Sequence, residues 1–301
     1  MTLLVPADPL RPRRPDEHFA AEADAARDAG LDVAVVDHDA LTSPDGARRG
    51  VARVKESGKE SGKQGGKQGG RDDGEEGGKA VYRGWMLRAE QYAAFAGALE
   101  DRDVTLRTDA AQYRRAHELP GWYAALAAVT PPTTWTVGDD REAFERAACD
   151  LGPGPAVLRD YTKSMKHHWH EAAFIPDLAD AGAAWTVASR FRELRDDDFT
   201  GGFVLRRFED LTKAEVRTWW VDGACRLVGA HPDTPDELPA ADLDLSAVAP
   251  LVAALGLPFV TVDLALRADG VWRVIELGDG QVSDRPTSID PSPFIAALVR
   301  S

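Results

Sequence analysis

The residues best suited to do chemistry are two carboxylates, Asp263 and Glu276, in the segment 260–277. Two strand-like runs there flank Asp269-Gly270, which is among the strongest short signals for a β-hairpin loop. With those two residues as the loop, Asp263 pairs with Glu276 and their β-carbons lie roughly 5 Å apart. Facing carboxylates repel unless a cation offsets the repulsion, and oxygen ligands favour magnesium or manganese over zinc. On the hairpin alone, an equally supported interpretation is that one carboxylate points to solvent at a frayed strand end.

The same loop also fixes the rest of the predicted pairing in this hairpin. Arg267 then faces Trp272, and Ala265 faces Val274. A four-residue loop leaves this register unchanged, whereas a three-residue bulged loop shifts it. The prediction that the two acids face each other therefore depends on the loop type.

A second hairpin is predicted over residues 215–229, around Asp222-Gly223. Alternation along its first strand places Glu215, Arg217 and Trp219 on one face. An acid and a base two residues apart are, by themselves, most simply a surface ion pair of little energetic value. If the hairpin stood alone, no site would be predicted from it.

Two adjacent arginines, Arg206 and Arg207, lie inside the apolar run 203–208. If this run is a strand, successive side chains point to opposite faces, so at least one arginine points inward or along a cleft. A guanidinium group held in one orientation is suited to bind a phosphate or a carboxylate.

The N-terminal third alternates predicted strands with predicted helices, an order that indicates a parallel sheet with crossover helices. The predicted strands are residues 3–5, 33–36, 80–82 and 104–106, and the predicted helices are 16–29 and 90–100. A helical segment at 110–129 is predicted to break at Pro120-Gly121. Tetrads of the form KESG and KQGG mark a flexible insertion, which we place at 45–79.

Pro131-Pro132 suggests a domain boundary, so we expect a first domain at 1–130 and a second at 131–301. The second domain is expected to be α+β and mainly antiparallel, with subdomains at 131–200 and 201–301. The predicted fold class is therefore an α/β parallel-sheet domain followed by an α+β domain.

The composition excludes several classes of partner. The chain has 301 residues, 44% of them hydrophobic, and a formal net charge of -14, which argues against nucleic acid and anionic membranes as partners. Its two cysteines, Cys149 and Cys225, give no disulfide framework. The N-terminus lacks the apolar core of a signal peptide, and no run reaches the roughly 20 apolar residues of a membrane span. We therefore expect a cytoplasmic protein.

Taken in order, five segments of residues 133–288 resemble the core of the ATP-grasp superfamily. They are PAVLRDYTKS, KHHWHEAAFIPD, FVLRRFEDL, EVRTWWVDG and VTVDLALRADGVWRVIELGDGQVS. The segments YRGWML, YTKSMKHHW and ELGDGQVS resemble, more narrowly, the ATP-grasp clade named for two arginines and a lysine. The resemblance implies an ATP-grasp fold with a Rossmann-like N-terminal domain and the use of ATP with Mg²⁺, or Mn²⁺ in its place.

The resemblance also implies roles for individual residues around the nucleotide. Arg159, Lys163 and Lys166 would reach the phosphates, and Arg217 would meet the β- and γ-phosphates. Glu215 would accept hydrogen bonds from the ribose hydroxyls. The hinge residues, which would hold adenine mostly through backbone groups, are Arg206, Arg207, Phe208 and Glu209.

The implied metal ligands are Asp263 and Glu276, with two departures from the superfamily pattern nearby. Gly278 stands where the superfamily commonly has Asn, so Asp279 or a water would complete the coordination sphere. Arg159 stands where Lys is usual, which keeps the charge but changes a point charge into a planar fork.

The activity implied by the resemblance is the ATP-dependent joining of a carboxylate to an amine through an acyl phosphate. Arg217 and Lys163 would act in catalysis, and closure of the loop after Lys163 would exclude water. The substrates would be a small-molecule or peptide carboxylate and amine. Two alternatives are a phosphotransferase on the same fold and a nucleotide-binding module without catalysis, the latter favoured by the altered Asn and Lys positions.

Two further groups of residues are candidate sites. The histidines at 167, 168 and 170 could bind zinc, but no third or fourth ligand follows at a familiar spacing. On the substrate side, Arg83 could bind a carboxylate or simply cover Trp85. Ser283, with Asp284 and Arg285 beside it, could also touch the substrate.

Overall fold

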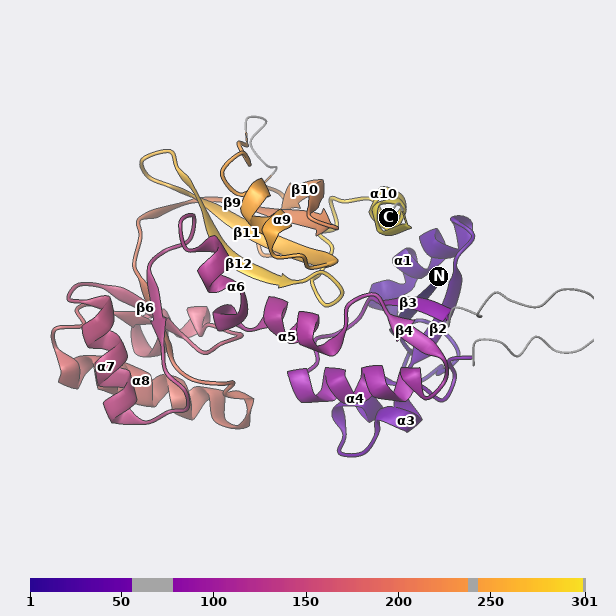
Figure 1. Ribbon diagram of the computed structural model, residues 1–301, viewed down its shortest axis with the longest axis horizontal. Coiled ribbons are helices and arrows are strands. Elements are labelled where there is room, and N and C mark those ends of the chain that lie inside the picture. The colour runs from indigo at the N-terminus through magenta and orange to yellow at the C-terminus, as the bar shows by residue number, and fades with distance from the viewer. Residues whose placement is uncertain (56–77, 238–242, 300–301) are drawn as a thin grey trace, which may run out of the picture. The chain divides into compact units, whose positions relative to one another are not determined.

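The computed structural model describes residues 1–55, 78–237 and 243–299, so most of the predicted insertion, residues 56–77, lies outside the described residues. The chain divides into two compact units (Figure 1). Unit 1 comprises Met1–Tyr113, Gly280–Arg285 and Ile289–Ser301, and unit 2 comprises Arg114–Asp279 and Pro286–Ser288. In the described part of the chain, no helix is both long and apolar enough to cross a membrane.

Unit 1 contains the predicted parallel sheet, with the strand order β2-β1-β3-β4. Its strands are β1 (Thr2–Pro6), β2 (Asp32–Val36), β3 (Gly78–Tyr82) and β4 (Val104–Leu106). Its helices are α1 (Glu17–Asp28), α2 (His38–Thr42), α3 (Ala47–Gly50), α4 (Ala89–Glu100) and α10 (Pro291–Val299), and α5 (Ala110–His117) spans the division between the units. The prediction of alternating strands and helices is confirmed.

The proposed insertion at 45–79 is too wide at both ends. Helix α3 forms within it, and Val51 and Val54 are buried against Leu41 and Val36 in the core of unit 1. At the other end, Gly78 and Lys79 already belong to β3. The prediction was too wide because it rested on the high glycine and lysine content of the whole segment. Two valines near its start are apolar enough to be buried in the core.

The expected domain boundary at Pro131-Pro132 also differs from the division at Tyr113 and Arg114. The segment before the two prolines packs into the core of unit 2, because Trp122 and Leu126 are buried there. The predicted helix break falls at Glu118, one residue before α6 (Leu119–Leu126). Pro120 lies in the first turn of α6, where its missing N–H costs no hydrogen bond.

Unit 2 contains two antiparallel four-stranded sheets, which confirms the predicted α+β class. The first has the order β5-β8-β6-β7, with β5 (Thr133–Trp135), β6 (Ala156–Arg159), β7 (Phe174–Ile175) and β8 (Val204–Arg207). The second has the order β10-β9-β11-β12, with β9 (Leu211–Val221), β10 (Ala224–Ala230), β11 (Phe259–Arg267) and β12 (Trp272–Asp279). The remaining helices are α6, α7 (Arg141–Leu151), α8 (Ala181–Arg195) and α9 (Ala249–Ala254), with short helical turns at Lys166–His168, Trp169–Ala173 and Asp196–Asp198.

The β11–β12 hairpin does not have the predicted register near its loop. Trp272 pairs with Leu266, not with Arg267. The N–H of Arg267 donates to the carbonyl of Val271 at 2.9 Å, which closes a three-residue loop at 268–270. A two-residue Asp-Gly loop was therefore the wrong prediction, and the register here is shifted by one residue.

A β-bulge then restores the predicted pairing of the two acids. Leu264 pairs with Val274, but the next pair is Asp263 with Glu276, so Ile275 is an extra residue in β12. Without this bulge, Glu276 would lie beyond Asp263 and on the other face of the sheet, because side chains alternate along a strand. The predicted pairing of Asp263 with Glu276 is thus confirmed. The loop is one residue longer than predicted, and β12 contains a bulge that was not predicted.

The β9–β10 hairpin has the predicted two-residue loop at Asp222-Gly223. Both residues have positive φ, 49° and 75°, as a type I′ turn requires. The turn also packs closely against α9, because a β-carbon placed on Gly223 would lie 2.9 Å from the Cα of Ala253. Glycine is therefore required here for two independent reasons.

We expect Gly223→Ala to lower the free energy of unfolding by more than about 1 kcal/mol, because it adds a clash to left-handed strain. Gly270→Ala should cost only the strain, since its φ is 87° and no atom lies within 4 Å of the added carbon. Gly97→Ala in α4, which also meets no atom within 4 Å, should stabilise by about 0.5–1 kcal/mol. Urea unfolding of the three variants would contradict this account if their order of stability differed.

Candidate active site

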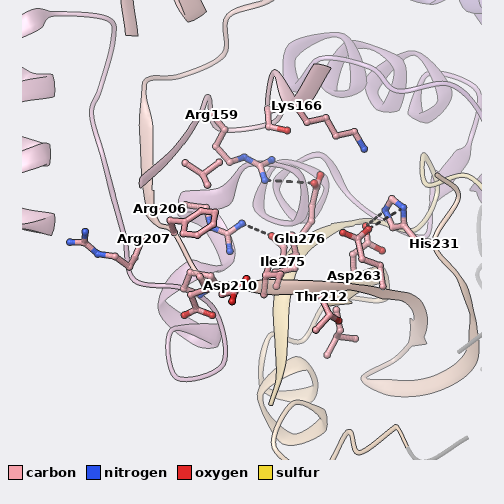
Figure 2. Close-up of a pocket in the computed structure, with 18 of the residues that line it drawn as sticks. Arg159, Lys166, Arg206, Arg207, Asp210, Thr212, His231, Asp263, Ile275 and Glu276 are labelled. Atoms are coloured by element: carbon pink, nitrogen blue, oxygen red, sulfur yellow. Dashed lines mark hydrogen bonds and ion pairs between the residues drawn. The ribbon is translucent and has the colours of Figure 1, made fainter. Parts of the chain in front are cut away.

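A cavity of about 430 Å³ lies within unit 2, where strands of both sheets and the turn after β6 meet. The residues that line it include charged groups of both signs (Figure 2) and two aromatic side chains. The charged residues are Arg159, Lys166, Arg206, Arg207, Glu209, Asp210, Glu215, His231, Asp263 and Glu276, and the aromatic ones are Trp169 and Phe208. Most of the residues proposed from the sequence to contact the nucleotide or the metal are therefore brought together.

The acidic side of the cavity is built by three neighbouring strands. Asp263 on β11 pairs with Arg217 on β9 and with Glu276 on β12. Its carboxylate forms a bidentate ion pair with Arg217, with both oxygen-to-nitrogen distances at 2.7 Å. Glu276 is less enclosed, and its carboxylate lies 3.6 Å from the guanidinium of Arg159. The two acids thus reach the same cavity, each next to an arginine.

His231, at the end of β10, joins three acids in this region and was not predicted from the sequence. Its Nε2 lies 3.4 Å from Asp263, and its Nδ1 lies 3.6 Å from both Glu215 and Asp233. A single histidine at the end of a strand has no distinctive spacing, so only the pairing of β9 with β10 and β11 reveals its neighbours.

The electrostatics of this group follow from burial and close charges. Burial disfavours ionisation of Asp263, but Arg217 and His231 outweigh it and hold the pKa of that carboxyl at about 2. Burial raises the pKa of Glu215 above its usual range. Burial also disfavours the charged imidazole of His231, yet its hydrogen bond to Asp263 raises the net pKa above the ordinary value.

The basic side of the cavity comes from β6 and the turn that follows it. Arg159 is buried and donates to the carbonyl of Thr162 at 2.9 Å. The turn is wound around the buried carboxylate of Asp160, which accepts hydrogen bonds from the N–H groups of Thr162 and Lys163. Asp160 was not singled out in the sequence, although a short polar side chain before a turn is typical of this arrangement.

The two predicted lysines differ in position. Lys166 lines the cavity and forms an ion pair with Asp233, which holds the pKa of that carboxyl below its usual range. Lys163 does not line the cavity. Burial, followed by the charge of Lys163, lowers the pKa of His117 to about 4, which places Lys163 in its neighbourhood. The segment after Lys163, expected as a loop, is folded as the short turns Lys166–His168 and Trp169–Ala173.

The predicted hinge after β8 lies along the cavity, but its two arginines point differently. Figure 2 shows Arg206 directed toward Ile275 and Arg207 directed away. Arg207 donates to the carbonyls of Leu151 and Pro153 at 2.7 and 2.8 Å, near the end of α7. The prediction that at least one arginine points inward is confirmed by Arg206, which is 6% exposed.

Backbone groups of the hinge are already partly used. The N–H groups of Arg207 and Phe208 donate to the carbonyls of Pro132 and Pro155, so neither is available to a base. The carboxylate of Glu209 is held by Arg273 at 2.8 and 2.9 Å. These contacts fix the path of the hinge, and they limit the backbone recognition expected from the sequence.

An aromatic wall borders the hinge. Phe208 lies edge-on to Phe174 with ring centroids 5.4 Å apart, and Phe174 stacks on Trp169, also at 5.4 Å. Phe208 is 37% exposed, and both it and Trp169 line the cavity. A planar, apolar ligand could pack against this wall. Trp169 was not selected from the sequence, where it lies within a histidine-rich run.

Several candidates lie elsewhere. Asp279 is fully buried and does not line the cavity, because three residues along a strand place it on the opposite face from Glu276. Arg83 is buried in unit 1, where its guanidinium is bidentate with Glu22. It also donates to three carbonyls, those of Gly280, Gln281 and Ser283. This geometry makes Arg83 a structural residue, and it does not support a role for Arg83 in binding a substrate carboxylate.

The segment that contains Ser283 likewise belongs to unit 1. Arg285 lies 3.3 Å from the buried Glu22, and Asp284 pairs with His18 at 3.0 Å. In the histidine-rich run considered for zinc, His168 lies 3.2 Å from Glu171. Among the described residues, no group of three or more His, Cys, Asp or Glu side chains is placed to hold a metal.

A magnesium ion nevertheless fits the donors that are present. Asp263 and Glu276 are oxygen donors that reach one cavity, and magnesium is commonly held by one or two carboxylates together with waters and the phosphates of a nucleotide. Arg159 and Lys166 on the same cavity supply positive charge for those phosphates. Two carboxylates beside two cationic side chains are therefore a donor set suited to magnesium bound together with a nucleotide.

Residues 150–298 match a family model described as an ATP-grasp domain, family 3 of the clade named for two arginines and a lysine. They are an ATP-grasp domain of that clade. The matched region contains both acids and most of the cavity lining, and the predicted family is thereby confirmed. A comparison with curated protein sequences gives no match.

Solved structures show the same fold over the whole chain. A RimK domain protein ATP-grasp from Sphaerobacter thermophilus DSM 20745 is 18% identical, with 100% of each chain covered and a TM-score of 0.61. D-cycloserine synthetase DcsG is 19% identical, with 99% of this chain and 100% of that chain covered and a TM-score of 0.61. The ATP-grasp ligase PsnB, complexed with minimal precursor, Mg and ADP, is 15% identical, with 99% and 97% covered and a TM-score of 0.56. At these identities, the likeness shows the ATP-grasp fold.

Asp263→Asn is expected to lower the free energy of unfolding at neutral pH by about 2 kcal/mol, because it removes the charge that Arg217 neutralises. The folded-state pKa of about 2 lies below the ordinary value of 3.8. The contribution is therefore complete above about pH 4 and is lost as the pH falls toward 2. Urea unfolding of both proteins from neutral pH to about pH 3 should show the difference shrinking. A difference that stays constant over this range would contradict the assignment.

Proposed function

We propose that this protein is an ATP- and magnesium-dependent carboxylate–amine ligase that acts through an acyl phosphate. The observation that carries the proposal is that Asp263 and Glu276 line one cavity together with Arg159 and Lys166. The cavity thus has oxygen donors for a divalent ion beside cations for a polyphosphate. The aromatic wall beside the hinge adds a surface for a nucleobase.

Structures with the same fold support this choice of nucleotide and reaction. PsnB is a ligase whose complex contains Mg and ADP, and DcsG is a synthetase. PsnB is also complexed with a precursor peptide and AMPPNP, and the macrocyclase MdnC from Microcystis aeruginosa MRC is bound with its precursor peptide MdnA. A small-molecule or a peptide carboxylate and amine are therefore the substrate classes that we propose for this chain.

In this proposal, adenine packs against the hinge and against the aromatic side chains of Phe208, within the hinge, and Trp169. Glu215 accepts hydrogen bonds from the ribose, as its position on the cavity allows. Arg159 and Lys166 contact the phosphates, and Lys163 joins them when the segment after Lys163 closes over the site. Arg217, now paired with Asp263, would meet the phosphates as the metal replaces it at that carboxylate.

The chemistry then proceeds in two displacements. A carboxylate oxygen of the acid substrate attacks the γ-phosphorus, and the bond from that phosphorus to the bridging oxygen of ADP breaks. The amine next attacks the acyl carbon, loses a proton, and releases inorganic phosphate. A bound magnesium would neutralise charge on the transferred phosphoryl group. The arginines and lysines of the site hold the phosphates in line, and closure of the segment after Lys163 keeps water from hydrolysing the acyl phosphate.

The double variant Asp263→Ala, Glu276→Ala should lower substrate-dependent ADP release at least about a hundredfold, because it removes both oxygen donors for the metal. Asp269→Asn in the same hairpin is the matched control, since this carboxylate is exposed and pairs with Arg267 outside the cavity. ADP release would be measured against a panel of amino acids and small acids, with mass spectrometry of the products. Wild-type turnover in the double variant would refute the proposed site.

ADP release without an amide product would instead favour the phosphotransferase on the same fold. Tight ATP binding with no ADP release under any mixture of acids and amines would favour the non-catalytic module. These two outcomes separate the ligase from its alternatives with one set of reactions.

Asp233→Asn should lower the KM for ATP by about two- to fivefold, because Asp233 competes with the phosphates for Lys166 and an exposed ion pair is worth at most about 1 kcal/mol. Lys166→Ala should raise the KM. Steady-state kinetics at fixed magnesium would measure both variants. An unchanged or higher KM in Asp233→Asn would show that Lys166 does not turn toward the nucleotide.

A further inference from the structure

The bulge in β12 creates a backbone problem next to the two acids. Ile275 is the extra residue between the pairs Leu264–Val274 and Asp263–Glu276. A bulge leaves its extra residue out of the ladder, and a backbone carbonyl buried without a partner is costly. The bulge that turns Glu276 toward the cavity therefore needs a donor from outside the hairpin.

Arg206 supplies that donor from β8, a strand of the other sheet. Its Nη1 donates to the carbonyl of Ile275 at 2.6 Å, the contact drawn as a dashed line in Figure 2. Its Nη2 donates to the hydroxyl of Thr130 at 2.9 Å and lies 3.4 Å from the carbonyl of Val274. The hydroxyl of Thr130 in turn donates to the carbonyl of Val274 at 2.8 Å. Arg206 and Thr130 together thus hold the two consecutive carbonyls at the bulge.

The consequence of the bulge is visible in which side chains reach the cavity. Beyond the bulge, Glu276 pairs directly with Asp263, and both residues line the cavity. Without the extra residue, Ile275 would pair with Asp263 and the side chain of Glu276 would point to the opposite face. The bulge therefore places the carboxylate of Glu276 on the same face of the sheet as Asp263. The hydrogen bond from Arg206 to the carbonyl of Ile275 stabilises the bulge.

A direct role for Arg206 in binding phosphate is the competing explanation, because it lines the cavity. Its Nη1 and Nη2 are committed to Ile275 and Thr130, and its Nε is buried. Burial, followed by the nearby charge of Arg159, lowers the pKa of Arg206 to about 9, so the group remains protonated at neutral pH. Its neighbour Arg207 provides a contrast, since it holds carbonyls of the turn at 151–153 instead.

We propose that Arg206 is a positioning residue which, by holding the carbonyl of Ile275, maintains the bulge that brings Glu276 to the same face as Asp263. This inference rests on the proposed function only in taking the two acids as the metal pair. The role concerns the geometry of the hairpin, and it is defined without any contact between Arg206 and the nucleotide.

The test measures the hairpin and the metal separately in Arg206→Met, with Arg207→Met as the matched control. Hydrogen exchange of residues 259–279, followed without ligand, should become faster in Arg206→Met and remain as in wild type in Arg207→Met. Calorimetric titration with ADP, with and without magnesium, should show that Arg206→Met loses about 10- to 100-fold of the magnesium-dependent gain in affinity. Its affinity for ADP without magnesium, measured in the same way, is the reference and should fall by less than the magnesium-dependent gain.

Thr130→Val is the milder variant if Arg206→Met does not fold, and it should change both readings in the same direction by less. Unchanged hairpin exchange, together with an equal loss of ADP affinity with and without magnesium, would overturn the inference and make Arg206 a nucleotide ligand. A wild-type protein with no magnesium-dependent gain would refute the proposed function instead. Faster hairpin exchange confined to the Arg206 and Thr130 variants would still support the positioning role.

Discussion

Two like charges that must share one wall of a cavity are the constraint on which this structure depends. Asp263 is held ionised by the bidentate contact with Arg217 despite its burial, and Glu276 faces Arg159. Each carboxylate is thus paired with an arginine, which lies on the neighbouring strand β9 for Asp263 and on β6 of the other sheet for Glu276. His231 is a further neighbour of Asp263. The balance is local, and in the proposed function a divalent ion bound at these carboxylates would supply positive charge in place of the arginines.

The surrounding protein can be understood as the support for that wall. The second sheet of unit 2 brings Arg217, Asp263 and Glu276 into one row across three strands. The first sheet contributes Arg159 and Arg206 from adjacent strands. The contact of Arg206 with the bulge and the ion pair of Glu209 with Arg273 tie the two sheets together around the cavity. These polar links are short and partly or fully buried, so they specify position more than they add stability.

Much of the fold could be predicted from the sequence because its signals were local. Strands β1 to β4, helix α1 and the hairpin at Asp222-Gly223 each follow from short patterns of apolar residues with a glycine at the turn. The family could be predicted from five segments in order, and the match over residues 150–298 confirms it. The predicted domain boundary differs from the observed division because it depends on non-local contacts. Trp122 and Leu126 pack against strands that lie far along the chain.

The site shows the same limit in finer detail. Asp263 and Glu276 could be paired by counting from Asp269-Gly270, but the count succeeded because an extra loop residue and an extra strand residue cancel. Neither signal is visible locally: a bulge at Ile275 is stable only if Arg206 reaches it from another sheet. His231 and Asp233 were not predicted as site residues for a related reason. Their partners lie in other segments, and the spacing of residues in the sequence does not show that these segments are neighbours. Asp279 was proposed from a family pattern, without regard to the face its strand position imposes.

The connection from β12 to the segment that follows has a mechanical consequence. Only residues 277–279 separate Glu276 from Gly280, whose carbonyl accepts a hydrogen bond from the buried Arg83 of unit 1. Leu277 and Asp279 are themselves buried in the strand, so this short stretch has little slack. The backbone on either side of this stretch is thus fixed locally, by the pairing of β12 with β11 and by the hydrogen bond from Arg83 to Gly280.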